Sequence, residues 1–585
     1  MSTVTRLRVG DEDFLVAATI ERCPRTMMIR ELLQNALEAS AGVAAGARRV
    51  EFSVLPLEGA RKLTLWNGGR GLDAEQLYRM CDIAASINKQ TGLDANFGMG
   101  AKVASLPSNQ HGMRYRSCRD GVVHEVMLGK RGGTYGRVLQ PGPDGTPTEI
   151  LEVTEAARAE GRDTGADWTE VVLLGQDPAQ DTAGDPYAGR PRSAPSWLLD
   201  TIGGRYFRFP EGAEVVLRPG VPPLPPTGAE HRFRPLEERL RALPSFEGGR
   251  YEAVSTPEGL VIHYGYDPAD PDRAGRNRSQ VTGPENAEGL AAVVFRDEMY
   301  GPSRGAQWRR EAPSFGIPVS ARHISVLVEL PAGYPAQAEG YREFLRYREG
   351  AQAQLRLIDF APQVAQHQPD WLREILAGGS PGAALAAEVQ SEMEELIQTL
   401  GVVRRRPPRP RTADAPPPVP ANTAAAPAEP APPGAPKPPA PARPIVLENA
   451  PALFLLRDEA AVADAGLAHR AACYYPESHQ LHVNMRYGAI PLLASLLLEG
   501  TEPDPALDAA ATEAAERATV LRVARALVHG LNKRGRPAEW NDHHLRQALS
   551  PEALTLAADD IHGGLADARA AFRQAQVAVA EPEAA

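Results

Sequence analysis

Apolar residues in the first part of the chain follow helical spacing in one segment and strand-like runs in others. From Thr26 to Gly42 they recur at helical intervals and a glycine ends the run, which predicts an amphipathic helix. Three later segments are rich in apolar and β-branched residues and predict strands, namely VEFSVLPL (50–57), KLTLW (62–66) and TEVVLL (169–174). This mixture predicts a first α+β unit over residues 1–195, which ends in a turn-rich segment.

The rest of the chain divides into a second α+β unit, a linker and a helix-rich unit. Residues 196–403 hold a predicted helix over 340–366 and the predicted strands GLVIHYGY (259–266), AAVVFRD (291–297) and ISVLVELP (324–331). Residues 404–444 are rich in proline and alanine and predict an extended, disordered linker with polyproline II character. Residues 445–585 contain the strongly amphipathic segment ATEAAERATVLRVARALVHGL (511–531), so a helix-rich C-terminal unit is predicted.

Composition limits the compartment and the partners. The 585 residues are 43% apolar, enough for packed cores, and apolar runs stay below the length of about 18 residues that marks a membrane span, so a cytoplasmic protein is expected. The net charge of -11 argues against coating nucleic acid through bulk charge, but it is compatible with one basic face. Cys23, Cys81, Cys118 and Cys473 are far apart and form no CxxC pair, so neither a zinc ribbon nor a disulfide framework is indicated.

Glu31 and Asn35 are the first candidates for chemistry. Residues four apart lie on one helix face, so the two side chains point the same way, while Leu32, Leu33 and Leu37 fill the other face. An asparagine oxygen is a hard ligand that suits Mg²⁺, and a glutamate can orient and deprotonate a water that attacks a phosphate. An exposed Glu and Asn on an amphipathic helix are also ordinary, so the pattern is weak by itself.

Two glycine-rich segments and a threonine are the next candidates. Asn67-Gly68-Gly69-Arg70-Gly71 follows the predicted strand KLTLW and lets a flat ligand approach the backbone, although a plain turn explains it about as well. Gly98-Met99-Gly100-Ala101-Lys102 leads into a predicted helix, where backbone N–H groups and the Lys102 charge suit phosphate oxygens. It lacks the third glycine of GxGxxG, and GxxxxGK[ST] does not occur. Thr169 begins a predicted strand, where it is either a ligand contact or an ordinary β-branched residue.

The order of these features resembles that of the GHKL ATPases, the group of gyrase, heat-shock-90 chaperones, histidine kinases and MutL that shares the Bergerat ATP-binding fold. ELLQNALEAS resembles their first box, ExxxNxxDA, with Glu38 in place of the Asp. NGGRG resembles DxGxG, FGMGAK resembles GxGxx[KSA], and Thr169 falls where the family has a late threonine. The resemblance covers residues 14–175 and is closer to the MutL, MORC and heat-shock-90 branch than to the histidine kinases.

This resemblance implies an ATP-hydrolysing molecular switch whose first unit is a mixed sheet with helices on one face. By position, Glu31 would be the general base and Asn35 the Mg²⁺ ligand. Residues 73–96 would form a lid over ATP. The nucleotide-binding residues would be Asn35, Asn67, Gly69, Gly71, Gly98, Met99, Gly100, Ala101, Lys102 and Thr169.

Asn67 departs from the family, which has Asp at this position. Both side chains accept a hydrogen bond from the adenine amino group, but a charged hydrogen bond contributes about 1.5–3 kcal/mol against about 1 kcal/mol for a neutral one. Lower affinity or a looser base preference is therefore expected, and a nucleotide-binding regulatory module with negligible turnover is the alternative. A histidine-type protein kinase is less favoured, because few residues precede Phe14 to supply phosphoacceptor helices.

The resemblance also implies partners. ATP would close two N-terminal units into a homodimer, and the client would be a protein or DNA. Many family members sense the γ-phosphate with a lysine of the second domain, but no lysine occurs between Lys130 and Lys437. An arginine from residues 273–280 or 304–311 is a candidate substitute.

A group of imidazole and thiol side chains near the C-terminus is a further candidate, in this case for a metal site. It comprises His469, Cys473, His479 and His482. In a strand, His479 and His482 would point to opposite faces, so a structural role is favoured over a metal.

Overall fold

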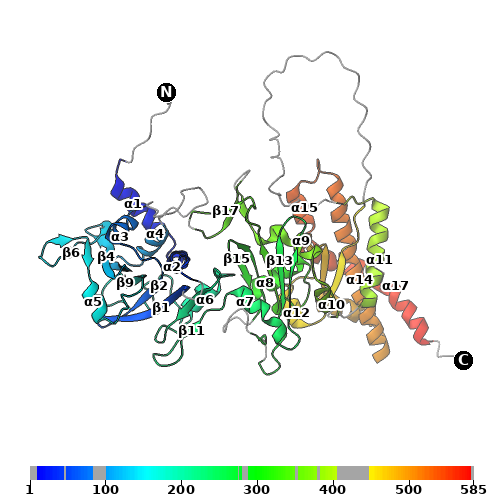
Figure 1. The fold of residues 1–585 in the computed structure, drawn as a ribbon. Helices are drawn as coiled ribbons and strands as arrows, with labels where there is room; N and C mark the ends of the chain where they lie inside the picture. Colours follow the sequence, from blue (N-terminus) through cyan, green and yellow to red (C-terminus); the bar gives the residue numbers. More distant parts are fainter. Residues whose placement is uncertain are drawn as a thin grey trace, which may run out of the picture.

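The computed structural model shows three units that follow one another in an elongated row (Figure 1). It describes residues 10–44, 48–83, 100–273, 276–279, 288–340, 342–348, 353–378, 383–404, 447–502 and 504–580. Each unit combines a sheet with helices, and the C-terminal unit is rich in helices, so the predicted α+β class is confirmed. Among the helices in these ranges, none is both long and apolar enough to cross a bilayer.

The first unit is built on a nine-stranded mixed sheet with the order β11-β10-β1-β2-β9-β3-β4-β5, and β8 pairs with β4. β1 and β10 are parallel, while β1, β2, β9, β3 and β4 run antiparallel to their neighbours in that order. The three predicted strands are confirmed as β1, β2 and β9. The sheet strands are β1 Arg48–Leu57, β2 Ala60–Gly68, β3 Gly112–Arg119, β4 Val122–Arg131, β5 Thr134–Arg137, β8 Ile150–Glu152, β9 Trp168–Gly175, β10 Ala213–Leu217 and β11 His231–Arg232, and β6 Gln140–Pro141 and β7 Pro147–Thr148 form a separate pair.

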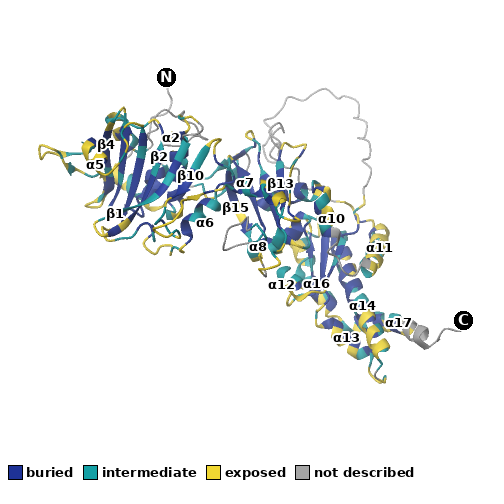
Figure 2. Cartoon of the chain, turned by 60° about the horizontal axis from the view of Figure 1, so that its bottom comes forward, coloured by how far each residue is buried: buried dark blue, intermediate teal, exposed yellow. Residues whose placement is uncertain are grey.

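Helices pack on both faces of this sheet. The helices of the first unit are α1 Glu12–Glu21, α2 Met28–Ser40, α3 Ala74–Met80, α4 Gly100–Ser105, α5 Thr154–Ala159 and α6 Trp197–Gly203. The predicted helix is confirmed as α2, which buries Leu33 and Leu37, four residues apart, against a core that includes Phe52 and Leu65. In Figure 2 many strands of this sheet are coloured dark blue, which marks their residues as buried. The short helix α5 packs on the opposite face, where Ala157 meets Trp168.

The first unit extends beyond the predicted boundary at residue 195. β10 pairs with β1, and Val215, Leu217 and Phe233 belong to the same core as α2. The turn-rich segment before it is also fixed to the sheet, because the Thr182 hydroxyl accepts from Leu63 N–H at 2.9 Å and donates to the Leu173 carbonyl at 2.8 Å. The turn-rich composition of this segment therefore does not mark the end of the first unit.

The second unit holds a five-stranded sheet in the order β12-β13-β16-β14-β15 and a small sheet β17-β18-β19. The three predicted strands are confirmed as β13, β14 and β16. The strands are β12 Arg250–Ser255, β13 Val261–Tyr266, β14 Leu290–Phe295, β15 Glu298–Arg304, β16 Ile324–Glu329, β17 Ala336–Ala338, β18 Leu345–Tyr347 and β19 Gln354–Leu355. The helices are α7 Leu236–Arg241, α8 Gly305–Glu311, α9 Ala361–Gln366 and α10 Asp370–Gly378.

The helix predicted over residues 340–366 is wrong. The described part of this segment holds strands β18 and β19 and a 3-10 turn, and α-helix begins only at Ala361. Leu345 and Tyr347 alternate along β18, which is strand spacing. Pro362 lies in the first turn of α9, where its missing N–H costs nothing, whereas it would break the interior of a longer helix.

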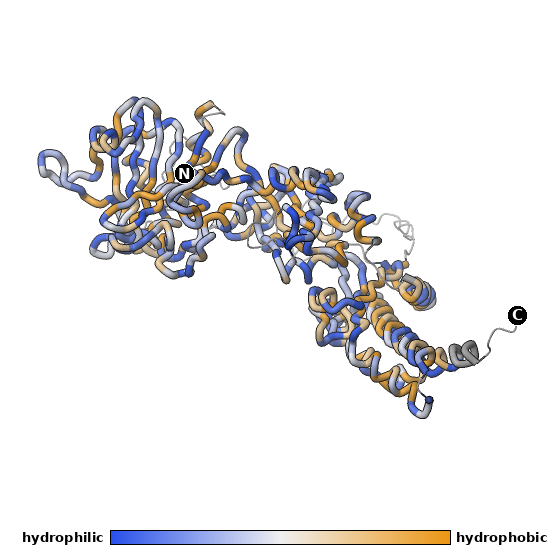
Figure 3. The backbone as a smooth tube through the Cα atoms, turned by 90° about the horizontal axis from the view of Figure 1, so that it is seen from below, coloured by the Kyte–Doolittle hydropathy of each residue, from blue (hydrophilic) through white to orange (hydrophobic). Residues whose placement is uncertain are grey.

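The C-terminal unit packs helices against a three-stranded sheet, β20-β22-β21. Its elements are β20 Ala452–Leu456, β21 Ala472–Tyr475, β22 Gln480–Asn484, α12 Glu459–Asp464, α13 Ala489–Leu497, α14 Pro505–Asn532, α15 Asp542–Ala548, α16 Pro551–Ala558 and α17 Ile561–Ala580. Helix α11 (Ala383–Leu400) lies within the range predicted for the second unit, yet Val389 and Met393 pack in this core with Leu521. Figure 3 shows the hydrophobic segments that run along these packed helices.

Candidate functional site

Helix α2 brings Glu31 against the start of α4. Glu31 is buried near the N-terminal end of α2, and Asn35, one turn later, is exposed. A Cβ atom at Gly100, the first residue of α4, would overlap a carboxylate oxygen of Glu31, so the approach of the two groups requires glycine. The structure therefore places the predicted base directly beside the predicted phosphate segment. Gly98, Met99 and the part of the predicted lid over residues 84–96 lie outside the described residues.

Lys102 and Ala101 are directed into the protein. Ala101 is part of the core beneath α2. The buried Lys102 ammonium donates to the carbonyls of Met80 and Asp82 at the end of α3. Burial lowers the pKa of Lys102 to about 8, while the charges of Cys81 and Asp82 oppose this shift. In this structure Lys102 joins α4 to α3, and its predicted contact with phosphates stays a prediction.

A row of polar side chains crosses the three central strands on the face covered by α2. Asn67 of β2 is in register with Thr169 of β9, which is in register with Ser117 of β3. The Ser117 and Thr169 hydroxyls are 2.9 Å apart, and Ser117 also accepts from Leu72 N–H at 2.8 Å. The Asn67 side chain donates to the Gly68 carbonyl at 3.1 Å. Ser117 was not predicted from the sequence. It lies two residues after the buried Tyr115 on β3, and this spacing places both side chains on the same face of the sheet.

The loop that follows β2 needs its glycines because other backbone approaches it closely. Gly71 has a φ of +60°, and a Cβ atom there would overlap the Cys118 carbonyl. A Cβ atom at Gly69 would lie 2.8 Å from the carbonyl oxygen of Ala39 at the end of α2. The two glycines thus fit the loop between α2 and β3, and their predicted role in shaping an adenine pocket stays a prediction.

Charged groups from both units surround Glu31. Arg30 forms ion pairs with Glu31 and with Glu298 of β15 in the second unit, where its Nε lies 3.0 Å from Oε2. Arg205, between α6 and β10, donates to the same Oε2 at 2.6 Å and to the carbonyl of Arg342 at 3.0 Å. The Arg342 Nε lies 3.9 Å from Glu31 Oε1, which closes the path.

Electrostatic interactions favour the charged forms of Glu298 and Arg30 in spite of their burial. Burial alone would raise the pKa of Glu298, but the charges and hydrogen bonds of Arg205 and Arg30 outweigh it and lower that pKa. Burial likewise disfavours the charged form of Arg30, but its hydrogen bond and attraction to Glu298 raise its pKa. Cys23 lies nearby, and burial together with the charge of Glu31 raises the pKa of its thiol to about 12.

The second-unit arginine that reaches Glu31 is not among those predicted. Arg278 pairs with Glu247 at 2.8 Å, and Arg309 pairs with Glu288 and with Asp464. The contact comes instead from Arg342, in the loop between β17 and β18, on the side of the second unit that faces the first (Figure 1). The role proposed for arginines of residues 273–280 or 304–311 at the γ-phosphate stays a prediction.

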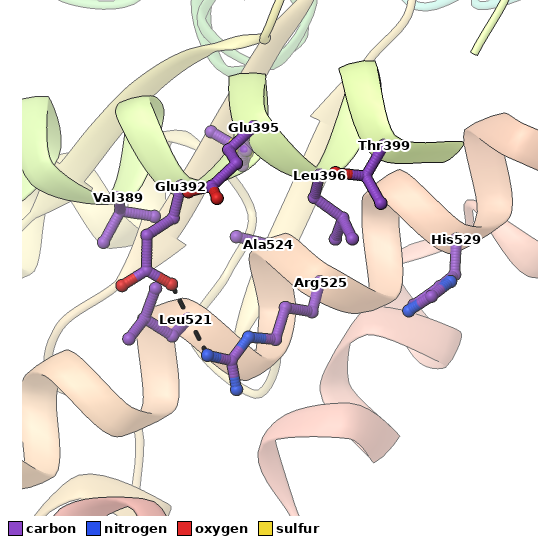
Figure 4. Close-up of a pocket in the computed structure, with 10 residues that line it drawn as sticks. Val389, Glu392, Glu395, Leu396, Thr399, Leu521, Ala524, Arg525 and His529 are labelled. Carbon is purple, nitrogen blue, oxygen red and sulfur yellow. Dashed lines mark hydrogen bonds and ion pairs between the residues drawn. The ribbon is translucent and has the colours of Figure 1, made fainter. Parts of the chain in front are cut away.

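A separate cavity of about 420 Å³ lies in the C-terminal unit between α11 and α14 (Figure 4). Glu392 and Arg525 face each other across it with an ion pair of 3.4 Å, and Leu521 contributes apolar surface. Its described lining residues all belong to these two helices, so it is distinct from the surroundings of Glu31. In the C-terminal sheet, His482 is buried on β22 and His479 precedes that strand. Within the part of the chain that the structure describes, no three His, Cys, Asp or Glu side chains are grouped as metal ligands.

Comparison with solved structures finds similar chains, among them two structures of gyrase subunits or domains. No protein-family model matches the chain, and no curated protein matches it. The chain is similar to the 43K ATPase domain of Thermus thermophilus gyrase B in complex with an aminocoumarin, with 16% identity, a TM-score of 0.29, and 60% of this chain and 84% of that chain covered. It is also similar to the B-subunit of the DNA gyrase from Myxococcus xanthus, with 14% identity, a TM-score of 0.31, and 60% and 92% covered. Function must therefore be inferred from the geometry of the site itself.

Proposed function

We propose that the first unit binds ATP with Mg²⁺ along α2 and hydrolyses it, with Glu31 as the general base. The observation that carries this proposal is that α2 contacts both glycine-rich segments, one at each end. Glu31 lies against Gly100 at the N-terminal end, and Ala39 lies against Gly69 at the C-terminal end. Eight residues of helix separate these contacts by about 12 Å, a length that an extended nucleoside triphosphate can span.

The side chains along this path suit such a ligand. The neutral polar row of Asn67, Thr169 and Ser117 lies at the end of α2 that is proposed for the adenine base of the nucleotide. At the other end, proposed for the phosphates, Gly100 exposes backbone without a side chain. The exposed amide oxygen of Asn35, one turn from Glu31, is a donor that fits Mg²⁺. When bound, Mg²⁺ would neutralise negative charge on the phosphates.

The test is steady-state phosphate release by the full-length protein. Glu31→Ala should lower kcat by about 10²–10⁴-fold, because a positioned general base contributes that much. Glu155→Ala is the matched control, since Glu155 is an exposed carboxylate on α5, on the opposite face of the sheet, and its loss should leave release unchanged. Equal release from wild type and Glu31→Ala would contradict the proposal.

A nucleotide-binding module with negligible turnover is the second candidate. Its support is that Glu31 Oε1 is contacted by both Arg30 and Arg342 while Oε2 lies against Gly100, so the carboxylate is engaged on both sides. Saturable ATP binding with release no higher than that of Glu31→Ala would favour it. A histidine-type kinase would instead leave acid-labile label on the chain after incubation with γ-labelled ATP.

The homodimer and the client remain part of the proposal. Nucleotide would close two first units together, and a protein or DNA client would respond to that closure. Light scattering of the full-length protein should show a doubled mass with ATP in the Glu31→Ala variant, which retains the nucleotide. A mass that does not change with ATP would remove the dimer from the proposal.

A further inference from the structure

Five charged residues form a closed ring that passes through both units. Starting from Glu31, the ring runs through Arg30 to Glu298, then through Arg205 to the Arg342 carbonyl, and the Arg342 guanidinium returns to Glu31. Glu31 and Arg30 belong to α2 of the first unit, while Glu298 and Arg342 belong to the second. The ring therefore connects the second unit with Glu31, the proposed general base, through side chains and the backbone carbonyl of Arg342.

Arg30, Glu31 and Glu298 are buried, Arg205 and Arg342 are partly buried, and the ring is held from several sides. The side chains of Arg30 and Glu298 are 3% and 6% exposed. The Tyr206 hydroxyl donates to the Arg30 carbonyl at 3.1 Å, and the Tyr300 ring lies 4.2 Å from the Arg205 guanidinium. Residue 206 also pairs with residue 298 through the backbone. These contacts leave Arg30 and Arg205 few alternative positions.

Stability alone is a weak explanation for such a ring. Desolvation of buried ions can exceed their mutual attraction, and apolar residues of similar volume often stabilise a core as well or better. The ring also includes Arg342, whose φ of 57° is a conformation that a residue other than glycine seldom adopts. An arrangement that buries charge and holds an uncommon backbone conformation is better explained by an effect on the orientation of the Glu31 side chain.

We propose that Glu298 and Arg205 are positioning residues that set the orientation of Glu31 through Arg30 and Arg342. This inference rests on the proposed function, since it assumes that Glu31 acts as the base. Arg30 is shared between two carboxylates, so Glu298 limits how closely Arg30 holds Glu31. Arg205 contacts both Glu298 and the loop that carries Arg342, so it acts on the two cations that converge on Glu31 Oε1.

Loss of the Glu298 charge has a defined consequence in this arrangement. The Arg30 guanidinium would be left with Glu31 as its remaining carboxylate, and a carboxylate held by a full guanidinium charge is less free to turn toward a water and accept its proton. The Arg205 guanidinium would lose its carboxylate as well, and the loop around Arg342 would lose part of its support. Both changes act on Glu31 and neither touches the polar row around Asn67.

Glu298→Gln in the full-length protein tests this, because it keeps the size of the side chain and removes the charge. The expected result is a kcat lower by about 10–100-fold with an unchanged Kd for ATP, since misplacement of a reacting group by about 1 Å can cost 10²-fold. Glu298→Asp keeps the charge and should recover part of kcat. Glu329→Gln is the matched control, because Glu329 is a carboxylate of the same sheet that pairs with Arg208 and His263, and it should leave kcat unchanged.

A second comparison separates positioning from a general loss of structure. In the Glu31→Ala background, Glu298→Gln should lower the residual turnover no further, because its effect passes through Glu31. An unchanged kcat in Glu298→Gln, or an equal loss with and without Glu31, would overturn the inference and leave the proposed function standing. Wild-type release equal to that of Glu31→Ala would instead overturn both.

Discussion

The two ends of α2 have different surroundings. Near the N-terminal end, Glu31 lies among guanidinium groups that come from both units, and its contacts are ion pairs between side chains. Near the C-terminal end, Gly69 packs on the Ala39 carbonyl, and Asn67 and Thr169 are fixed by the register of a single sheet. The end proposed for the base of the nucleotide is thus organised within one unit, whereas the end proposed for the phosphates depends on how two units are held together.

The largest expected effect is on stability, and it tests the end of α2 that is organised within one unit, at Gly71. Gly71→Ala puts a Cβ atom against the Cys118 backbone at a φ of +60°, so the backbone itself must move, and the free energy of unfolding should fall by about 2–4 kcal/mol. Urea unfolding of the full-length protein measures this change.

Gly132→Ala is the control for the conformational part of that effect. Gly132 has a similar φ of +58° with no atom within 4 Å of a built Cβ, so this variant should lose about 1–2 kcal/mol at most. Equal losses at the two positions would show that the close approach to Cys118 contributes nothing.

Gly100→Ala is the counterpart at the charged end and should act on turnover. The added Cβ atom meets the end of the flexible Glu31 side chain instead of backbone, so the fold should survive while Glu31 is displaced. We expect kcat to fall by about 10–100-fold with little change in the unfolding midpoint. A protein that unfolds more easily but keeps its kcat would contradict the contrast between the two glycines.

Asn67→Asp sharpens the comparison by placing a charge at the neutral end, and its expected effect is the smallest. If Asn67 faces the adenine amino group, a charged acceptor should tighten ATP binding by about 2–30-fold, the difference between a charged and a neutral hydrogen bond. Calorimetric titration of Asn67→Asp and wild type with ATP gives the ratio. Because Asn67 donates to the Gly68 carbonyl and an aspartate cannot, weaker binding would mean that this internal contact, and not adenine, is what the position serves.

Local signals in the sequence predicted the elements that carry the first part of the site. The spacing of apolar residues identified α2, and runs of β-branched residues identified β1, β2 and β9. The order of the motifs also predicted that Glu31 and Gly100 belong to one site; the structure brings the two residues together, and their shared function stays a prediction. The helix and the strands depend on residues that are close together in the sequence, and the motifs depend on their order along the chain, so both can be recognised without the structure.

The rest of the site depends on contacts that no local pattern reports. Arg30 and Glu298 are separated by 268 positions, and the contact of Arg342 with Glu31 requires a hairpin that looked helical from its apolar spacing. Ser117 was overlooked because a single serine in a strand has no distinctive neighbours. Its position became evident from the register of β3 with β9.

The parallel pairing of β10 with β1 makes residue 195 a poor place to divide this chain. A fragment that stopped there would lose Val215 and Leu217 from the core and would leave the backbone N–H and C=O groups along β1 open. An open, apolar edge of this kind pairs readily with other chains and promotes aggregation. A fragment that continues past Phe233 would end its sheet instead on β11, a two-residue strand with His231 and Arg232 exposed, which gives a second chain little to pair with.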